Sequence, residues 1–185
     1  MDENKWFSDE NVIQKSKKAY AHFDLRTNVV KARKYITNPD KIKHHGFYPF
    51  IKYVMRYDRF HKVNGKLAFD PKEREICYSA HIDRCIYQYY SALLNEKYNL
   101  RLKHDGINNV PVAYRTDLYC NNIDIFRQAI DFIRECQSCY VMIGDFTDFF
   151  DKINHQYLKR QLCNLLGIKR LKTRLLCCFQ KYYSI

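Results

Sequence analysis

The stretch "YVMIGDFTDFFDKINH", residues 140–155, decides how the rest of the chain is interpreted. It opens with an apolar run at 140–144, whose length predicts a buried strand. Asp145 follows this run directly, and two adjacent phenylalanines and two further aspartates come within the next six residues. An aspartate between a strand and a helix is often only a helix N-cap, so spacing alone leaves a structural and a chemical role open for Asp145.

The regions around this stretch predict an α+β chain that is rich in helices and has short antiparallel strands. Asn64-Gly65 stands between two alternating runs in residues 56–79, which is a strong signal for a hairpin. Apolar periodicity and the positions of Pro and Gly predict helices at 11–36, 82–94, 122–136 and 149–166 and a short strand at 110–114. The expected order is therefore helix, hairpin, helix, loop, helix, strand and helix.

The composition indicates a folded and strongly basic protein. Of the 185 residues, 46% are hydrophobic and 16% are aromatic, which is typical of a chain that buries one sizeable core. The formal charge of +12 is unevenly placed, since residues 15–66 hold fourteen Lys or Arg against three Asp, and residues 152–185 hold eight against none. Such stripes usually meet phosphates or an anionic membrane surface.

Other sequence features bear on location and on metal sites. No stretch approaches the roughly 18 to 20 apolar residues that a membrane span needs, and the first thirty residues lack a signal-peptide core. We therefore expect a soluble cytoplasmic protein, with nucleic acid ahead of membrane as its partner. The eight cysteines fall singly or in isolated pairs such as Cys136 and Cys139, which indicates buried or free thiols rather than a zinc site.

Three segments resemble one protein family, and they follow one another in that family's order. "GDFTDFFDKINHQYL" (144–158) resembles the first palm motif of reverse transcriptases: an Asp, an apolar residue, two variable positions, two aromatics, then Ile-x-His and Leu. "PKEREICYSAHIDRCIYQYY" (71–90) resembles a fingers segment, and "VPVAYR" (110–115) before "NNIDIFRQAIDFI" (121–133) resembles the next one. The chain is most similar in kind to bacterial enzymes of the retron, group II intron and phage-defence types.

The resemblance implies the fingers and the first part of the palm of a right-hand polymerase, with an incomplete palm and no thumb. It runs from about Phe47 to the end of the sequence, and the basic residues before it match nothing specific. The implied division is a basic helical extension at 1–45, fingers with the start of the palm at 46–138, and a palm strand with the first metal-binding motif and following helices at 139–185.

The resemblance also implies roles for particular residues in a two-metal transfer that uses Mg²⁺ or Mn²⁺. Asp145 would bind both ions, and the carbonyl of Phe146 would help to bind the second. Lys72 and Arg74 would clasp the triphosphate of the incoming nucleotide, although a solvated hairpin face remains an alternative for them. The backbone amides of Asp148 and Phe149 would contact the same anion, and Tyr114 and Arg115 would contact the template or the nucleotide. His155 would brace the helix. Phe150 would exclude the ribose 2′-hydroxyl and so favour DNA synthesis, unless it only fills the palm core.

The sequence departs from the family at its second metal-binding motif. It contains no aromatic-x-Asp-Asp turn and no Asp-Asp dipeptide at all. Two divalent ions at about 4 Å repel by roughly 16 kcal/mol at an effective dielectric near 20, so Asp145 cannot hold both alone. We therefore expect a reverse-transcriptase fragment that is inactive alone, or half of a split polymerase completed by a partner subunit or a missing C-terminal half. Its partners would be an RNA template, a DNA or RNA primer and dNTPs; the alternatives are a noncatalytic RNA-binding module or a basic interaction scaffold.

Overall fold

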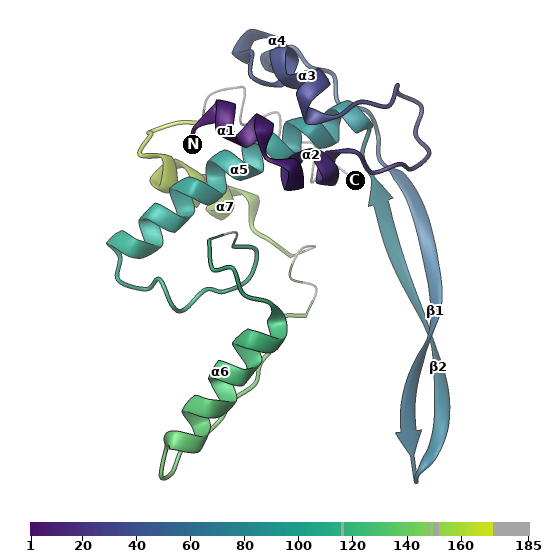
Figure 1. Cartoon of the computed structure of the whole chain (residues 1–185), viewed down its shortest axis with the longest axis vertical. Coiled ribbons are helices and arrows are strands. Elements are labelled where there is room, and N and C mark those ends of the chain that lie inside the picture. The colour runs from purple at the N-terminus through teal and green to yellow at the C-terminus, as the bar shows by residue number, and fades with distance from the viewer. Residues whose placement is uncertain (116, 148, 150–151, 172–185) are drawn as a thin grey trace. The chain divides into compact units, whose positions relative to one another are not determined.

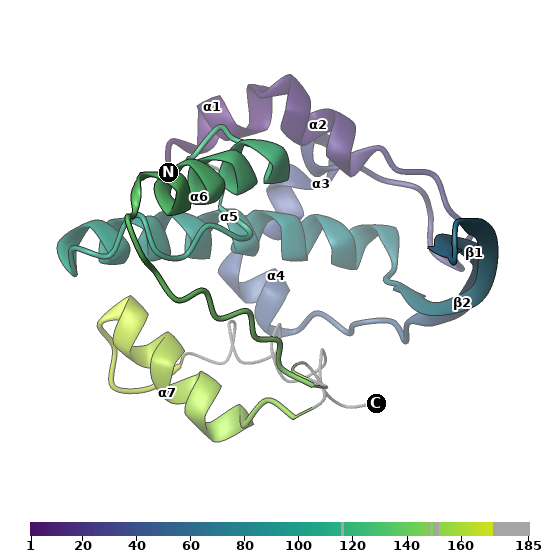
Figure 2. The ribbon, with the colours of Figure 1, turned by 90° about the horizontal axis from the view of Figure 1, so that it is seen from below.

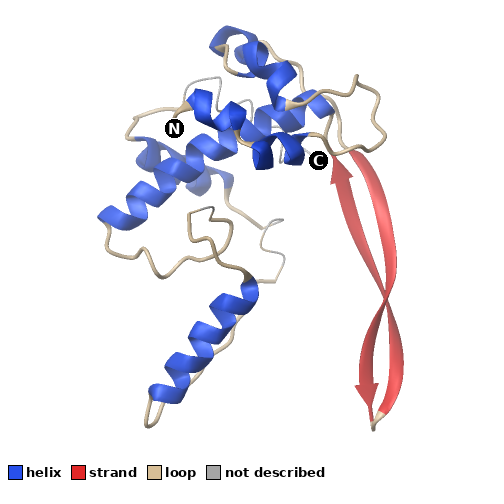
Figure 3. Ribbon diagram, in the orientation of Figure 1, coloured by secondary structure: helices blue, strands red, loops and turns tan. Residues whose placement is uncertain are grey.

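The computed structural model describes residues 1–115, 117–147, 149 and 152–171, which form seven helices and one two-stranded antiparallel sheet (Figures 1 and 3). The predicted α+β class is confirmed for this part of the chain. Tertiary contacts divide it into two compact units, of which the first is Met1–Ala92 and the second begins at Leu93. The long helix α5 (His81–His104) contributes its first half to one unit and its second half to the other.

Short helices open the first unit: α1 (Glu3–Ser8), α2 (Glu10–Ser16), α3 (Val29–Ile36) and α4 (Pro39–Lys43). An Asp or Asn precedes each of them and accepts a backbone N–H of the first turn, as Asn28 does from Lys31 at 2.9 Å. The single helix predicted over 11–36 is therefore wrong, because residues 17–28 are not helical. Tertiary hydrogen bonds replace helical ones there, and the Tyr20 hydroxyl donates to the carbonyl of Ser79 at 2.8 Å.

The core of the first unit surrounds the first half of α5, with α1 and α2 running along that helix (Figures 1 and 2). Val29 and Ile36 from α3, Ile42 from α4, and Cys85 and Ile86 from α5 are completely buried. Burial raises the pKa of the Cys85 thiol to about 11, so this cysteine is an inert core residue. The six cysteines in the described ranges are all free thiols.

Two buried carboxylates fix the start of α5. Asp24 accepts from the ring of His81 at 2.7 Å and from the backbone N–H of Ile82 at 3.0 Å. Asp83 accepts from the ring of His45 at 2.6 Å and from the backbone N–H of Tyr48 at 2.9 Å. Each carboxylate thus ties a preceding, non-helical segment to the same helix end, which places the chain for its entry into the hairpin.

The hairpin is a ribbon of two long strands, β1 (Ile51–Val63) and β2 (Lys66–Tyr78), drawn in red in Figure 3. Their register runs from Val63 opposite Lys66 to Ile51 opposite Tyr78. Asn64 and Gly65 both have positive φ, at 50° and 77°, which is the requirement of a type I′ turn. The predicted hairpin is confirmed, but its strands are longer than the short strands expected from the sequence. At about 3.3 Å per residue, thirteen residues span roughly 40 Å.

The second unit contains the end of α5 together with α6 (Asn122–Glu135) and α7 (His155–Leu166). The predicted helix at 122–136 is confirmed as α6, which begins with a capping box of Asn121 and Asp124. The helix predicted from Phe149 begins six residues later, because the Asn154 side chain accepts the N–H of Tyr157 at 2.8 Å and starts α7 there. No helix in the described ranges combines the length and the apolarity needed to cross a lipid bilayer.

Two predicted strands are wrong. Residues 110–114 form turns rather than a strand, and residues 140–144 are extended without belonging to any sheet of the described part. The apolar run at 140–144 is also not buried: Tyr140, Met142 and Ile143 are almost completely exposed. A strand needs a ladder partner as well as a suitable sequence, and the described sheet consists of β1 and β2.

Candidate nucleic-acid interface

The register of the ribbon defines two faces with different side chains. Successive residues of a strand point to opposite faces, and directly opposed residues share a face. The basic face, as we name it, is formed by Tyr53, Met55, Tyr57, Arg59 and His61 of β1 and by Lys66, Asp70, Lys72 and Arg74 of β2. The paired face, on the other side, carries Lys52, Arg56, Asp58 and Lys62 of β1 and Glu73 and Glu75 of β2.

Charge is distributed very differently on the two faces. The basic face has four Lys or Arg side chains and a single acid, Asp70, which lies directly opposite Arg59. The paired face has three basic and three acidic side chains, so its charges balance. Two ion pairs form on it: Lys52 Nζ lies 2.5 Å from Glu75 and Arg56 Nε lies 2.7 Å from Glu73. The hydrogen bond from Lys52 to Glu75 raises the pKa of that lysine. Only the basic face therefore presents uncompensated positive charge.

Lys72 and Arg74 stand two residues apart at the middle of this basic face. The guanidinium of Arg74 lies over the ring of Tyr57, with 5.5 Å between Cζ and the ring centroid, and Tyr57 is directly opposite Lys72. Neither cation forms an ion pair with any residue of the described ranges. Two such cations on one face of a strand can hold phosphate oxygens.

Asp145 lies in the second unit, in an exposed and extended segment. Its Oδ1 accepts the N–H of Phe146 at 2.8 Å, and the ring of Phe146 lies 5.9 Å from that of Phe149. No group of three His, Cys, Asp or Glu side chains that could hold a metal occurs in the described ranges. The carboxylates described in this segment therefore do not suffice by themselves for a pair of divalent ions.

The residues predicted to contact the nucleotide after Asp145 lie only partly within the described ranges. Asp148 and Phe150, together with Asp151, lie outside the described residues, so the anion contact of Asp148 and the sugar contact of Phe150 stay predictions. The amide of Phe149 was expected at the start of a helix, but α7 begins at His155, so a helix N-terminus does not contribute there. Phe149 instead lines a hollow of about 520 Å³ with Phe146 and Tyr157.

Arg115 has a structural role that sequence reasoning missed. Its Nε and Nη2 bind Asp117 at 3.0 and 2.7 Å, Nη2 also binds Asn108 Oδ1 at 2.9 Å, and Nη1 donates to the carbonyls of Asn108 and Pro111. All five guanidinium donors are thus used within one loop, and its side chain is fully buried. The hydrogen bond to Asp117 raises the pKa of Arg115 and lowers that of Asp117.

Tyr114, the other predicted template contact, is 90% exposed and has a φ of 59°. Its carbonyl accepts from the side-chain amide of Asn95 at 2.9 Å, so the backbone is held while the ring is free for a ligand. The sequence does contain a signal for the structural role of Arg115, because two potential acceptor side chains, Asn108 and Asp117, lie within seven positions of it. Template binding by Tyr114 and Arg115 stays a prediction.

The predicted site residues fall into two groups. Lys72 and Arg74 belong to the first unit, whereas Asp145, Tyr114 and Arg115 belong to the second. A joint site for triphosphate and metal therefore stays a prediction, and the basic face is the candidate interface that one unit presents by itself.

In comparisons with known proteins, no family model matches the chain and no curated protein matches it. The resemblance to reverse transcriptases rests on the three motifs.

Proposed function

We propose that this chain forms the fingers and the first part of the palm of a reverse transcriptase, an enzyme that copies an RNA template into DNA. The observation that carries the proposal is the basic face of the ribbon, where Lys72 and Arg74 are neighbours and form no ion pair with the described residues. This pair lies within one of the three segments that resemble the family in order. The register of the ribbon and the resemblance of residues 71–90 to a fingers segment thus both support a role for Lys72 and Arg74.

In the proposed enzyme, Lys72 and Arg74 bind the anionic triphosphate of the incoming nucleotide. A guanidinium offers a planar pair of N–H donors to phosphate oxygens, and an ammonium group adds a mobile point charge. The Tyr57 ring beneath Arg74 restricts the orientation of the guanidinium, which lowers the entropy lost on binding. This side-chain arrangement accounts for nucleotide binding, while the chemical step requires further groups.

Asp145 is the carboxylate that the family motif assigns to the metal ions. Because the sequence has no Asp-Asp dipeptide, the other metal ligands would come from further groups of the complete enzyme. Mg²⁺ or Mn²⁺, when bound, would polarise the phosphoryl group and activate the primer hydroxyl. The exposed position of Asp145 is compatible with a role in a site completed by other groups.

A second candidate function is a noncatalytic RNA-binding module. The favouring observation is that the basic face lies entirely within the first unit and requires neither Asp145 nor a metal ion. Such a module would hold RNA through phosphate contacts alone, with an affinity that falls steeply as salt rises.

Primer extension on an RNA template distinguishes these two functions. For the complete enzyme with Mg²⁺ or Mn²⁺ and dNTPs, we expect DNA synthesis that Asp145→Ala abolishes while RNA binding is kept. Asp131→Ala, which removes an exposed carboxylate on α6, serves as the matched control and should leave synthesis unchanged. RNA binding without any nucleotide incorporation would reject the polymerase and favour the binding module.

A further inference from the structure

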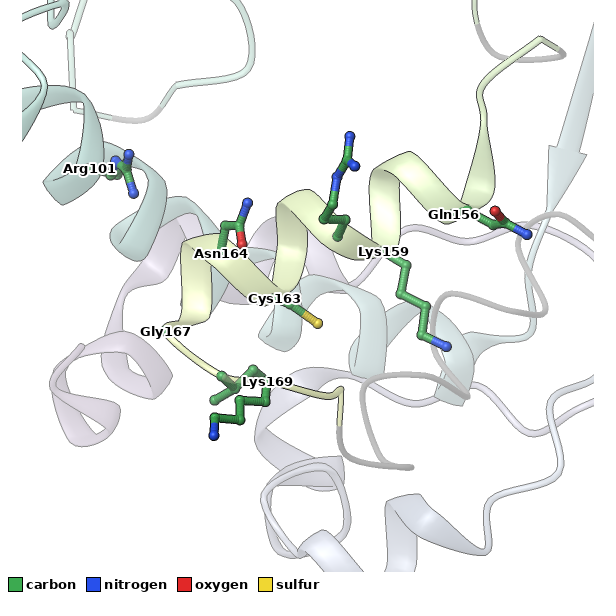
Figure 4. Close-up of a pocket in the computed structure, with 9 residues that line it drawn as sticks. Arg101, Gln156, Lys159, Cys163, Asn164, Gly167 and Lys169 are labelled. Carbon is green, nitrogen blue, oxygen red and sulfur yellow. The ribbon is translucent and has the colours of Figure 1, made fainter.

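A second basic surface lies along α7 in the second unit, where a hollow of about 790 Å³ follows the helix and the turn after it (Figure 4). Its cations are Lys159 and Arg160 on α7, Lys169 after α7, and Arg101 near the end of α5. No acidic side chain of the described residues lines it. We call this feature the α7 hollow, and none of the residues predicted from the sequence to form a site belongs to it.

Helix geometry explains why these side chains gather. Gln156, Lys159 and Cys163 recur at intervals of three and four residues, so they share one face of α7. Gly167 then ends the helix with a φ of 63°, and the N–H of Ile168 returns to the carbonyl of Cys163 at 3.0 Å. Figure 4 shows the side chains of Lys159 and Lys169 extending to the same side of α7 as the Cys163 thiol.

The positive charge of the α7 hollow is largely uncompensated. Lys159, Arg160 and Lys169 form no ion pair with the residues that the structure describes, whereas Nε of Arg101 is bound to Asp105 at 2.6 Å. The guanidinium of Arg160 lies over the ring of Tyr157, with 5.3 Å from Cζ to the ring centroid. Side-chain amides of Gln156 and Asn164 add neutral donors to the lining.

We propose that the α7 hollow binds the phosphodiester backbone of an RNA strand. Cations without acidic neighbours, combined with amide donors, are the groups that contact phosphates in nucleic-acid interfaces. Twelve helical residues at about 1.5 Å each give a length of roughly 18 Å, enough to follow several consecutive phosphates. The identity of the anion as RNA rests on the proposed function, which the α7 hollow extends by a second binding surface.

A lipid surface fits the α7 hollow less well than RNA does. Helices that lie on membranes combine their basic residues with protruding Trp, Phe or Leu side chains. Apart from the cations, the amides and Gly167, the lining consists of Cys163 and Ile168, and both are only half-exposed. The hollow thus offers polar donors and no apolar anchor.

Fluorescence anisotropy with a labelled single-stranded RNA tests the proposal on the whole chain. The test variant is Lys159→Gln/Lys169→Gln, and the matched control is Arg127→Gln/Arg134→Gln, which removes two exposed charges from α6. We expect the test variant to bind RNA about tenfold or more weakly, with a salt slope of log Kd reduced by about 1.4, because each lost contact to a single strand contributes roughly 0.7. The control should bind like the wild type, and Lys159→Arg/Lys169→Arg should restore affinity.

The outcomes separate this proposal from the proposed function. Wild-type RNA affinity in Lys159→Gln/Lys169→Gln overturns the α7 hollow alone, whatever the ribbon variant Lys72→Gln/Arg74→Gln does. Loss in the α7 variant without loss in the ribbon variant supports the hollow and counts against the basic face as an RNA-binding surface, whereas the proposed enzyme is tested separately by primer extension. If the wild-type chain binds no RNA, the α7 proposal is rejected, and primer extension by the complete enzyme still tests the proposed function.

Two competitors identify the source of the anion. Inorganic phosphate should displace the RNA only at a large excess, since one phosphate fills a small part of an extended surface. Displacement at concentrations similar to that of the RNA would make the hollow a site for a single small anion and overturn the RNA proposal. Binding to vesicles of phosphatidylserine and phosphatidylcholine is the second measurement. If Lys159→Gln/Lys169→Gln loses binding to these vesicles but keeps its RNA affinity, the RNA proposal is also overturned.

Discussion

The guanidinium of Arg74 lies over the ring of Tyr57 from the opposing strand, with Cζ 5.5 Å from the ring centroid. A cation over an aromatic ring is attracted electrostatically by the ring face, and this contact requires no hydrogen bond from the guanidinium. Tyr57 is also directly opposite Lys72 in the register. One aromatic side chain therefore contacts one of the two cations that the proposed function requires and lies opposite the other in the register.

The two faces of the ribbon should differ in RNA binding. If the basic face holds RNA, as in the second candidate function, Lys72→Gln/Arg74→Gln should weaken binding of single-stranded RNA about tenfold or more at 100 mM salt, because two phosphate contacts are lost. Lys52→Gln/Arg56→Gln removes the same charge from the paired face, where both cations already bind glutamates, and should change affinity much less. Equal losses in the two variants, measured by anisotropy, would show that only the total charge matters.

The ring of Tyr57 should contribute through Arg74 rather than through its hydroxyl. Tyr57→Phe should bind RNA like the wild type, whereas Tyr57→Leu should lose about two- to fivefold, the equivalent of about 0.5 to 1 kcal/mol for an exposed cation–π contact. Titrations of both variants with the same RNA measure this difference. An equal loss in Tyr57→Phe would instead assign a hydrogen bond to the hydroxyl.

Arg115→Lys should open the loop at 108–117. Lysine has three donors on one nitrogen and cannot replace the five bonds that Arg115 makes, so acceptors on Asn108 and Asp117 lose their partner. We expect faster hydrogen exchange in this loop, corresponding to a loss of about 1 to 3 kcal/mol in local stability. Arg127→Lys on the exposed side of α6 should leave exchange unchanged, and similar protection in both variants would contradict the structural role.

Asp24 should make the stability of the first unit sensitive to acid. Burial raises the pKa of Asp24, but hydrogen bonds from His81 and the backbone N–H of Ile82 outweigh it, so the pKa lies below its usual value. A depressed pKa stabilises the fold above the unfolded value of about 3.9, and this contribution disappears as pH falls through the folded pKa. Asp24→Asn should therefore lower the free energy of unfolding by about 1 to 3 kcal/mol at pH 7.

Thermal melts across pH measure this dependence. The difference between wild type and Asp24→Asn should be constant above about pH 5 and should narrow below about pH 4. Asp58→Asn changes an exposed ribbon carboxylate opposite Pro71 and should have little effect at any pH. A difference that stays constant down to acid pH would mean that the charge of Asp24 does not contribute to stability.

Gly65→Ala should destabilise the ribbon selectively. Gly65 has a φ of 77°, and an L-residue in this conformation costs about 1 to 2 kcal/mol. Gly46→Ala is the matched control, because a Cβ there would meet no atom within 4 Å and its φ is not in the left-handed region. Cross-strand NOEs between β1 and β2 should weaken only in Gly65→Ala, and intact NOEs would show that the strands hold the turn without the glycine.

Local signals in the sequence predict some elements of this fold well. The hairpin follows from Asn64-Gly65 because a type I′ turn depends on two neighbouring residues. Helix α6 follows from its apolar periodicity and from the cap at Asn121, both of which lie within the segment. The position of Lys72 and Arg74 on one face of a strand likewise follows from their spacing of two residues.

The elements that could not be predicted depend on distant residues. The break in the helix expected at 11–36 involves Tyr20 and Asp24, whose partners Ser79, His81 and Ile82 lie more than fifty positions away. The strand expected at 140–144 required a ladder partner, which composition does not encode. The later start of α7 did have a local signal, the capping side chain of Asn154, which was outweighed by the apolar residues before it.

The Asn64-Gly65 turn also determines on which side of the ribbon the positive charge lies. Side chains alternate with a period of two, so a register shift of one residue in β2 would bring Lys72 and Arg74 to the side of Arg56 and move Glu73 and Glu75 next to Tyr57. One inserted uncharged residue at the turn would thus mix the charges of the two faces without altering the net charge. If Lys72 and Arg74 bind phosphates as proposed, the chain length at this turn is therefore as important for binding as the identity of the two cations.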